Sequence, residues 1–545
     1  MRRWNFLGLV IATLFMVASM SPSLIPRPWP FQCVVSGIVT AAGYGLGTLL
    51  SYLWRRLPIP EPPGRWKASA WGGLAVLGPA AVLAATLLGV GYQRDLRQMM
   101  EMPLPQAWGY LAAPVIGAFL AAILVGAGRG VRYLSRRVSK ALSRWLPGQL
   151  ATVVGAVLVT ILVVGILDGV VVNALFSAAD ETFRLTDEAV AEDLAPPTSS
   201  LRSGSPESFT RWDDLGSKGR AFVAGGPTVV ELEDFGGEGA VEPIRVYAGL
   251  SSAEDIGDRA ELVLAELIRT RAFERAVVGV VTTTGTGWVD PEAAAAIEYV
   301  WGGDTALAAL QYSYLPSWLS FMVDSVRARE AGAELFNVIY DHWSTLPEAE
   351  RPLLLVFGES LGADGSEAAF SGAADLRNRT SGVLWVGPPN FSELWSSFTA
   401  GRDSRSPEIL PLFEGGETVR FAGGRADLVG DLEGWDQPRV LYMQHPSDPV
   451  VWWSTRLILR QPDWLRQQPG DDVLAAVRWY PLVTFWQVSA DMAYANEVPA
   501  GHGHNYAGLF ADGWAAVAAP PGWTPADTDR LHVLLDAQAN AALAR

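Results

Sequence analysis

The chain has 545 residues, which indicates two or three domains, and half of its residues are hydrophobic. Its single cysteine, Cys33, excludes an intramolecular disulfide and leaves a cysteine-based metal site without support. Residues 1–176 carry 15 basic and 4 acidic residues, whereas residues 177–545 carry 26 and 53. That acidic excess predicts a soluble second part that binds no nucleic acid.

The first third of the chain contains five apolar segments, each near the ~20 residues that a helix needs to cross a bilayer. We therefore predict an α-helical transmembrane bundle of about five spans over residues 1–177, with the lipid bilayer as a partner. The spans run from Trp4 to Met20, Phe31 to Trp54, Ala70 to Tyr92, Gly109 to Ala127 and Gln149 to Phe176.

Two features of this bundle bear on its assembly. The spacing Gly43-x-x-x-Gly47 in the second span predicts that helices approach closely in lipid. The first span also has the pattern of a signal peptide, with Arg2 and Arg3 before a short apolar core. The four prolines between residues 22 and 30 favour a structured connection between spans, but the sequence leaves cleavage of the first span open.

The basic residues predict the orientation of the bundle. One set of connections carries twelve lysines and arginines, six of them in the loop over 129–144, and the other set carries three. The positive-inside rule therefore predicts a multi-pass protein of the plasma membrane with a cytoplasmic N-terminus. After five spans, everything beyond Phe176 is expected to be extracytoplasmic. The 129–144 loop has the charge to bind anionic lipid headgroups, but an ordinary positive-inside anchor explains it more simply.

After the bundle, residues 178–219 are rich in Asp, Glu, Ser and Pro and predict a linker. From residue 220 to residue 545, apolar strand-like runs alternate with helix-like stretches, which predicts a mostly parallel sheet covered on both faces. Residues 389–437 lack clear periodicity, and we expect them to form an insertion or cap above the sheet. The predicted strands are 243–247, 276–283, 306–314, 353–357, 383–386 and 440–444.

One of these strands leads directly into a nucleophile motif. The apolar residues 353–357 precede Gly358-Glu359-Ser360-Leu361-Gly362, and a helical segment follows. This is the nucleophile-elbow pattern, in which a serine on a sharp strand-to-helix turn needs neighbours without clashing side chains. We predict that Ser360 is the nucleophile.

A serine nucleophile needs an acid and a base, which in this type of fold follow it in the order Ser, Asp or Glu, His. Asp448 lies just past the strand over 440–444, at the sheet edge where catalytic groups gather, and Asp491 is a second candidate in more helical surroundings. His502 and His504 lie late in a glycine-flanked loop; we prefer His502 as the base and keep His504 as the alternative. His445 is expected to support the acid loop.

An oxyanion hole should combine the Leu361 backbone N–H with a donor from the loop after an earlier strand. The run Thr282–Trp288 closes the strand over 276–283, and we expect Gly285 and Thr286 to contribute. A phosphate-binding glycine loop is the weaker explanation because no Lys-Ser or Lys-Thr pair opens a helix after it. The sequence suggests no metal and no cofactor.

These motifs make the chain similar to a membrane-anchored α/β-hydrolase family found mainly in actinobacteria, sometimes called α/β-hydrolase family 9. The resemblance implies a multi-span domain joined to a hydrolase domain, and a serine hydrolase of the cell envelope. The matching stretches are Ser21–Pro28, Thr284–Trp288, Gln311–Trp318, the elbow, Trp385–Pro389, His445–Trp453 and Gly501–Tyr506.

The sequence thus predicts an extracytoplasmic serine esterase tethered to the membrane, with an ester or acyl substrate of the envelope and an acyl-enzyme on Ser360. An acyltransferase that passes the acyl group to a lipid or sugar hydroxyl is an alternative with the same chemistry. A non-catalytic protein that retains the hydrolase fold is a third. The intact order of serine, aspartate and histidine argues against that third possibility.

Overall fold

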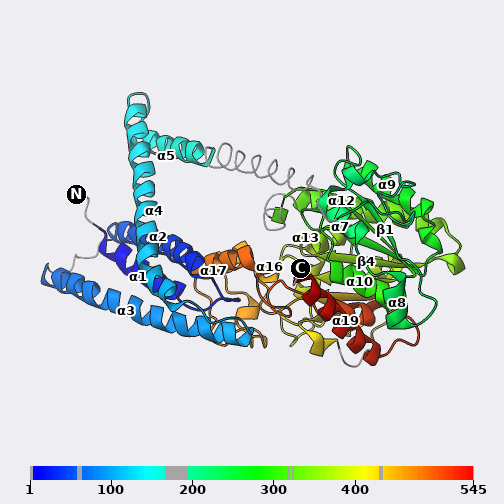
Figure 1. The fold of residues 1–545 in the computed structure, drawn as a ribbon. Coiled ribbons are helices and arrows are strands. Elements are labelled where there is room, and N and C mark those ends of the chain that lie inside the picture. The colour runs from blue at the N-terminus through cyan, green and yellow to red at the C-terminus, as the bar shows by residue number, and fades with distance from the viewer. Residues whose placement is uncertain are drawn as a thin grey trace. The chain divides into compact units, whose positions relative to one another are not determined.

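The computed structural model describes residues 4–57, 64–165, 194–315, 320–321, 325–428 and 434–543. The chain forms two compact units, which we name the helical unit and the sheet unit (Figure 1). The helical unit comprises residues 1–179 and 454–494, and the sheet unit comprises residues 180–453 and 495–545. Residues 454–494, which the sequence assigned to the hydrolase domain, therefore belong with the N-terminal helices.

In the described residues of the N-terminal part, the helical unit contains α1 (Phe6–Ser19), α2 (Trp29–Trp54), α3 (Gly64–Met99), α4 (Ala107–Leu142) and α5 (Gly148–Gly165). Among the described residues, three stretches are long and apolar enough to cross a membrane: Trp29–Trp54, Ala68–Met99 and Ala107–Leu142. The predicted count of five spans is not confirmed, because α1 and the apolar part of α5 are shorter. Residues 166–176 of the fifth predicted span lie outside the described residues.

Small residues allow the first two helices to pack closely, as the glycine spacing predicted. A Cβ atom added to Gly47 would lie 2.5 Å from the carbonyl oxygen of Leu7, and one added to Gly43 would lie 3.0 Å from that of Ile11. Any larger residue at Gly47 would push α1 away from α2. Helix α4 differs from its prediction, since it continues through the expected 129–144 loop as far as Leu142.

The segment 454–494 covers one end of this bundle. It contains the short helices η7 (Thr455–Ile458), η8 (Asp463–Leu465), α17 (Val483–Asp491) and η9 (Met492–Tyr494). Val483 of α17 is buried in a cluster with Val35 and Val39 from the first half of α2. An apolar helix face against the bundle thus explains why this segment leaves the sheet unit.

The sheet unit is built on seven parallel strands, which confirms the predicted mostly parallel sheet. Their order across the sheet is β1-β3-β2-β4-β5-β7-β6. The edge strand β6 lies within the residues expected to form an insertion, so part of that segment returns to the sheet. The strands are β1 (Ile244–Ala248), β2 (Val277–Thr282), β3 (Thr305–Leu310), β4 (Leu353–Glu359), β5 (Gly382–Val386), β6 (Val419–Ala422) and β7 (Arg439–Met443).

Helices cover both faces of this sheet (Figure 1). One group contains α9 (Ile256–Arg269), α12 (Ser325–Thr345) and α13 (Leu361–Glu367), and the other contains α10 (Pro291–Val300), α18 (Phe510–Ala518) and α19 (Pro525–Leu543). The sheet unit also contains the shorter helices α7 (Gly216–Ala224), α8 (Val229–Gly236), α14 (Ala373–Arg379), α15 (Glu393–Ala400) and α16 (Pro449–Trp452).

Part of the predicted linker is packed against this sheet. Ser203 is buried, and its backbone N–H donates to the Arg245 carbonyl in β1 at 3.1 Å. The Arg202 side chain donates to Glu242 at 3.0 Å and to the Val223 carbonyl at 2.7 Å. The described residues from 194 onward are therefore integrated in the sheet unit, and residues 178–193 lie outside the described part.

Candidate active site

Ser360 occupies a strained turn between β4 and α13. Its φ of 55° and ψ of −126° are rare for a residue with a side chain, and its backbone N–H donates to the Val386 carbonyl of β5 at 2.8 Å. A Cβ atom on Gly358 would lie 2.5 Å from the Gly362 carbonyl oxygen, and one on Gly362 would lie 2.3 Å from that of Thr282. The two glycines of the motif are therefore required by close backbone approach.

Asp448 follows β7 and is completely buried. Its Oδ1 accepts a hydrogen bond from the Val450 N–H at 2.8 Å, which caps the short helix α16. Its Oδ2 lies 2.7 Å from Nδ1 of His504. One oxygen thus fixes the carboxylate in its loop while the other is directed to a histidine.

The histidine that contacts Asp448 is His504, the alternative base, and not the preferred His502. His502 is half-buried and forms a β-bridge with Asn505. Gly503 between them has a φ of 54°, so the chain turns there and the two imidazoles take different surroundings. A glycine precedes both histidines, so the sequence contained no signal that distinguishes His502 from His504.

Two further contacts join the acid loop to the histidine loop. The Gly503 N–H donates to Ser447 Oγ at 2.7 Å, and the Gly503 carbonyl lies 2.9 Å from Nδ1 of His445. His445 thus supports the loops, as expected. Tyr506 was missed from the sequence although it ends a quoted motif: its hydroxyl donates to Asp448 Oδ2 at 2.8 Å and its ring stacks on His445 at 4.2 Å.

The imidazole of His504 lies beside the strand end that holds the elbow. A Cβ atom on Gly387 would lie 2.5 Å from Cε1 of His504, and Gly387 directly follows Val386, which accepts the Ser360 N–H. Nε2 of His504 is buried and has no hydrogen-bond partner among the described residues. A buried, unpaired ring nitrogen next to the elbow is available to accept a proton.

The glycine-containing loop after β2 lies next to the elbow. Thr282 is paired with Gly358 across β2 and β4, and Gly287 N–H closes a turn on the Thr284 carbonyl at 2.9 Å. The expected donors Gly285 and Thr286 lie within that turn. Leu361 is the first residue of α13, so its N–H belongs to the group that a helix leaves without an internal partner.

Three acidic side chains with raised pKa values surround the elbow, and the sequence did not indicate them. Burial raises the pKa of Glu359 well above its usual range, and the charges of Asp290, Asp448 and Glu292 raise it further. Burial also raises the pKa of Asp290 to about 6 and that of Glu292 to about 7, against opposing backbone hydrogen bonds. The raised pKa of Glu359 favours its neutral form, which carries no negative charge next to Ser360.

The part of the chain that the structure describes contains no cluster of three or more His, Cys, Asp or Glu side chains able to hold a metal ion. The arrangement of Ser360, His504 and Asp448 is suited to nucleophilic attack on a carbonyl, with proton transfer through the imidazole.

Comparison with known proteins gives two matches to family models. A model described as an alpha/beta-hydrolase family matches residues 244–531. A second, described as the N-terminus of an alpha/beta-hydrolase family, matches residues 20–227. No curated protein and no solved structure matches the chain.

Proposed function

Because the chain belongs to this alpha/beta-hydrolase family, we propose that it is a membrane-tethered serine hydrolase that cleaves carboxylic esters of the cell envelope. The observation that carries the proposal is the 2.7 Å contact between Asp448 and His504, with the unpaired Nε2 of His504 beside the elbow of Ser360. These are the parts that an acyl-enzyme mechanism requires.

In the proposed reaction, Ser360 Oγ attacks the ester carbonyl while Nε2 of His504 takes the hydroxyl proton. Asp448 holds the imidazole through Nδ1 and stabilises the imidazolium that forms. The N–H of Leu361 and the turn after β2 stabilise the oxyanion. His504 then donates its proton to the leaving alcohol, and water, activated by the same imidazole, releases the acid from Ser360.

We propose that the sheet unit faces the outside. The positive-inside argument supports this, and the position of α17 adds to it. Tyr494, at the end of segment 454–494, has its ring 5.1 Å from that of Phe31 at the start of α2. Arg55 follows the other end of α2, and 24 residues of helix correspond to about 36 Å, more than the ~30 Å hydrocarbon core. Segment 454–494, which connects the two parts of the sheet unit in the chain, thus packs at the end of α2 that lies opposite the arginine-rich end.

Labelling of the purified full chain with a fluorophosphonate probe tests the chemistry. We expect Ser360→Ala and His504→Ala to lower both labelling and hydrolysis of p-nitrophenyl esters by at least about 10³-fold. The exposed Ser371→Ala and the neighbouring His502→Ala are the matched controls, and both should retain labelling. Labelling that persists in Ser360→Ala would contradict the proposal.

A separate experiment tests the location. A tag at the C-terminus should be digested by protease added to intact cells or spheroplasts, whereas a tag at the N-terminus should be protected. Protection of the C-terminal tag would contradict the proposed orientation without affecting the chemistry.

A further inference from the structure

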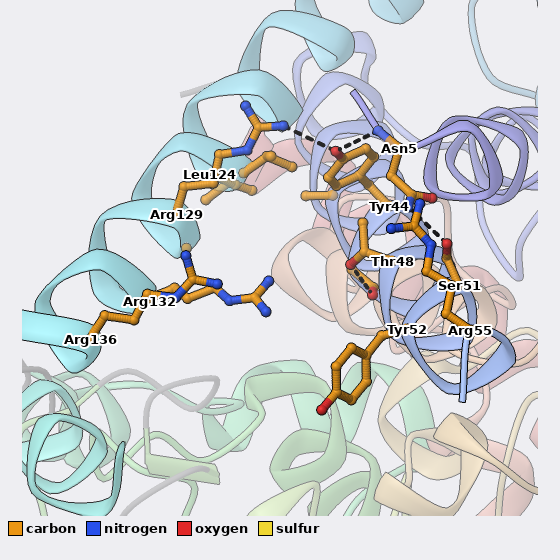
Figure 2. A pocket seen from close by; sticks show the side chains of 14 residues that line it. Asn5, Tyr44, Thr48, Ser51, Tyr52, Arg55, Leu124, Arg129, Arg132 and Arg136 are labelled. Carbon is orange, nitrogen blue, oxygen red and sulfur yellow. Dashed lines mark hydrogen bonds between the residues drawn. The ribbon is translucent and has the colours of Figure 1, made fainter. Parts of the chain in front are cut away.

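A pocket of about 640 Å³ lies between α2 and α4 in the helical unit (Figure 2). Its residues come from the second half of α2 and the residue after it, the second half of α4 and the residue before α1. Four of them are arginines: Arg55 after α2, and Arg129, Arg132 and Arg136 on α4. The other residues that line it are Asn5, Ala41, Tyr44, Gly45, Thr48, Ser51, Tyr52, Leu124, Val125 and Gly128.

One arginine is held firmly in the wall of this pocket. Arg129 donates to the Tyr44 hydroxyl at 3.0 Å, and its guanidinium lies 4.5 Å from the ring centre of Trp4. The Tyr44 hydroxyl also accepts the Asn5 N–H at 3.2 Å, and the Asn5 side chain donates to Ser51 at 2.9 Å. This hydrogen-bonded wall, visible in Figure 2, gives the pocket a defined polar side.

The carboxylates of the described residues do not neutralise the charge of the pocket. Within the described ranges, no carboxylate forms an ion pair with any of the four arginines. Acidic residues are few here: residues 1–165 contain only Glu61, Asp95 and Glu101, of which Glu61 lies outside the described residues, and none of the four aspartates of segment 454–494 lines the pocket. Four cations around one cavity without a carboxylate repel each other unless an anion occupies it.

The lining also changes in character along the helices. Of the lining residues, Ala41 on α2 and Leu124 on α4 are the farthest from the C-terminal ends of their helices. The hydroxyl residues and the arginines lie closer to those ends. The pocket therefore combines an apolar inner wall with a cationic mouth. That combination fits an amphiphile whose charged group lies at the membrane surface.

We propose that this pocket binds the phosphate group of an anionic ligand, with the headgroup of an acidic phospholipid as its source. Guanidinium groups form paired hydrogen bonds with phosphate oxygens, and Arg132 and Arg136, one helical turn apart, extend from α4 toward α2 in Figure 2. Arg129 and Tyr44 form the fixed side of the site. The site is separate from Ser360 and goes beyond the proposed hydrolase function.

Retention of lipid by the purified full chain tests this proposal. The protein, carrying Ser360→Ala so that no ester is consumed, is solubilised from vesicles of phosphatidylcholine containing phosphatidylglycerol, and bound lipid is counted by native mass spectrometry. We expect the unaltered pocket to retain phosphatidylglycerol in preference to phosphatidylcholine. The double variant Arg132→Ala/Arg136→Ala should weaken this retention by about tenfold or more, since two charge-assisted contacts are lost.

The matched control removes the same charge from the same helix outside the pocket. Arg137→Ala/Lys140→Ala should retain phosphatidylglycerol as before, because neither residue lines the cavity. A third variant, Arg132→Lys/Arg136→Lys, keeps the charge but not the paired donors and should retain an intermediate amount. Equal loss in the control and pocket variants would overturn the proposal, since it would reflect general surface charge.

Inorganic phosphate and glycerol 3-phosphate distinguish the two sources of the phosphate group. If they displace phosphatidylglycerol only at great excess, a lipid is the ligand. If they raise the thermal midpoint of the lipid-free protein, and the pocket variant abolishes that shift, a soluble phosphate is the ligand and the site stands. Absence of both lipid preference and phosphate stabilisation would overturn the proposal.

Discussion

Two completely buried aspartates, one in each unit, use the same side chain in different ways. Asp448 in the sheet unit is bound by His504, Tyr506 and the Val450 N–H. Asp491 in the helical unit forms an ion pair with the buried Arg27 at 3.0 Å and also accepts from Ser23, the Leu24 N–H and Tyr494.

The difference lies in the cationic partner. Arg27 is permanently charged and its remaining donors reach Gln32 and the Gln487 carbonyl, so that network is complete. The partner of Asp448 is the imidazole of His504, and its second nitrogen is unpaired among the described residues. A buried aspartate therefore indicates structure when its partners are saturated and chemistry when its partner retains an unused titratable atom.

Replacing each carboxylate by an amide should separate the two roles most strongly. We expect Asp448→Asn to lower kcat for ester hydrolysis by about 10³- to 10⁴-fold, because the imidazole loses its orienting acceptor. Asp491→Asn should leave kcat within about twofold when rates are normalised to folded protein. The comparison fails if both variants lose activity to the same extent.

Replacing each aspartate by alanine should affect stability in the opposite order, with the larger loss at Asp491. Asp491→Ala leaves Arg27 buried without its counter-ion, and we expect a loss of about 3–5 kcal/mol. Asp448→Ala leaves three polar groups without their partner, and a loss of about 1–3 kcal/mol is expected. Thermal unfolding of the detergent-solubilised chain measures both. A larger drop in the midpoint for Asp448→Ala would refute this assignment.

The smallest expected effects come from the two tyrosines that bind these aspartates. Tyr506→Phe removes a 2.8 Å hydrogen bond to Asp448, and kcat should fall by about 3- to 10-fold with little change in KM. Tyr494→Phe removes a 3.1 Å bond to Asp491 and should leave kcat unchanged. Steady-state kinetics of the two variants at equal folded fraction provides the test, and an effect of Tyr494→Phe on kcat would contradict it.

Sequence patterns were sufficient where short-range constraints act. The elbow at Ser360 needs small neighbours, and the predicted strands are continuous apolar runs, so both were predictable. The choice between His502 and His504 depends on a turn at Gly503 and on loops distant in sequence. Likewise, the apolar face of α17 predicts that the helix is buried but does not identify the surface that covers it. For this reason Asp491, at the end of α17, remained a candidate acid.

The pairing of Arg27 with Asp491 joins residues 464 positions apart. During synthesis at ~5–20 residues per second, the arginine would emerge roughly 25–90 s before its partner. Arg27 would thus lack its counter-ion while the apolar N-terminal helices are made, and all seven strands of the parallel sheet would be made before Asp491. Completion of the helical unit is therefore coupled in time to nearly full-length translation, so a prematurely terminated chain retains an incomplete bundle.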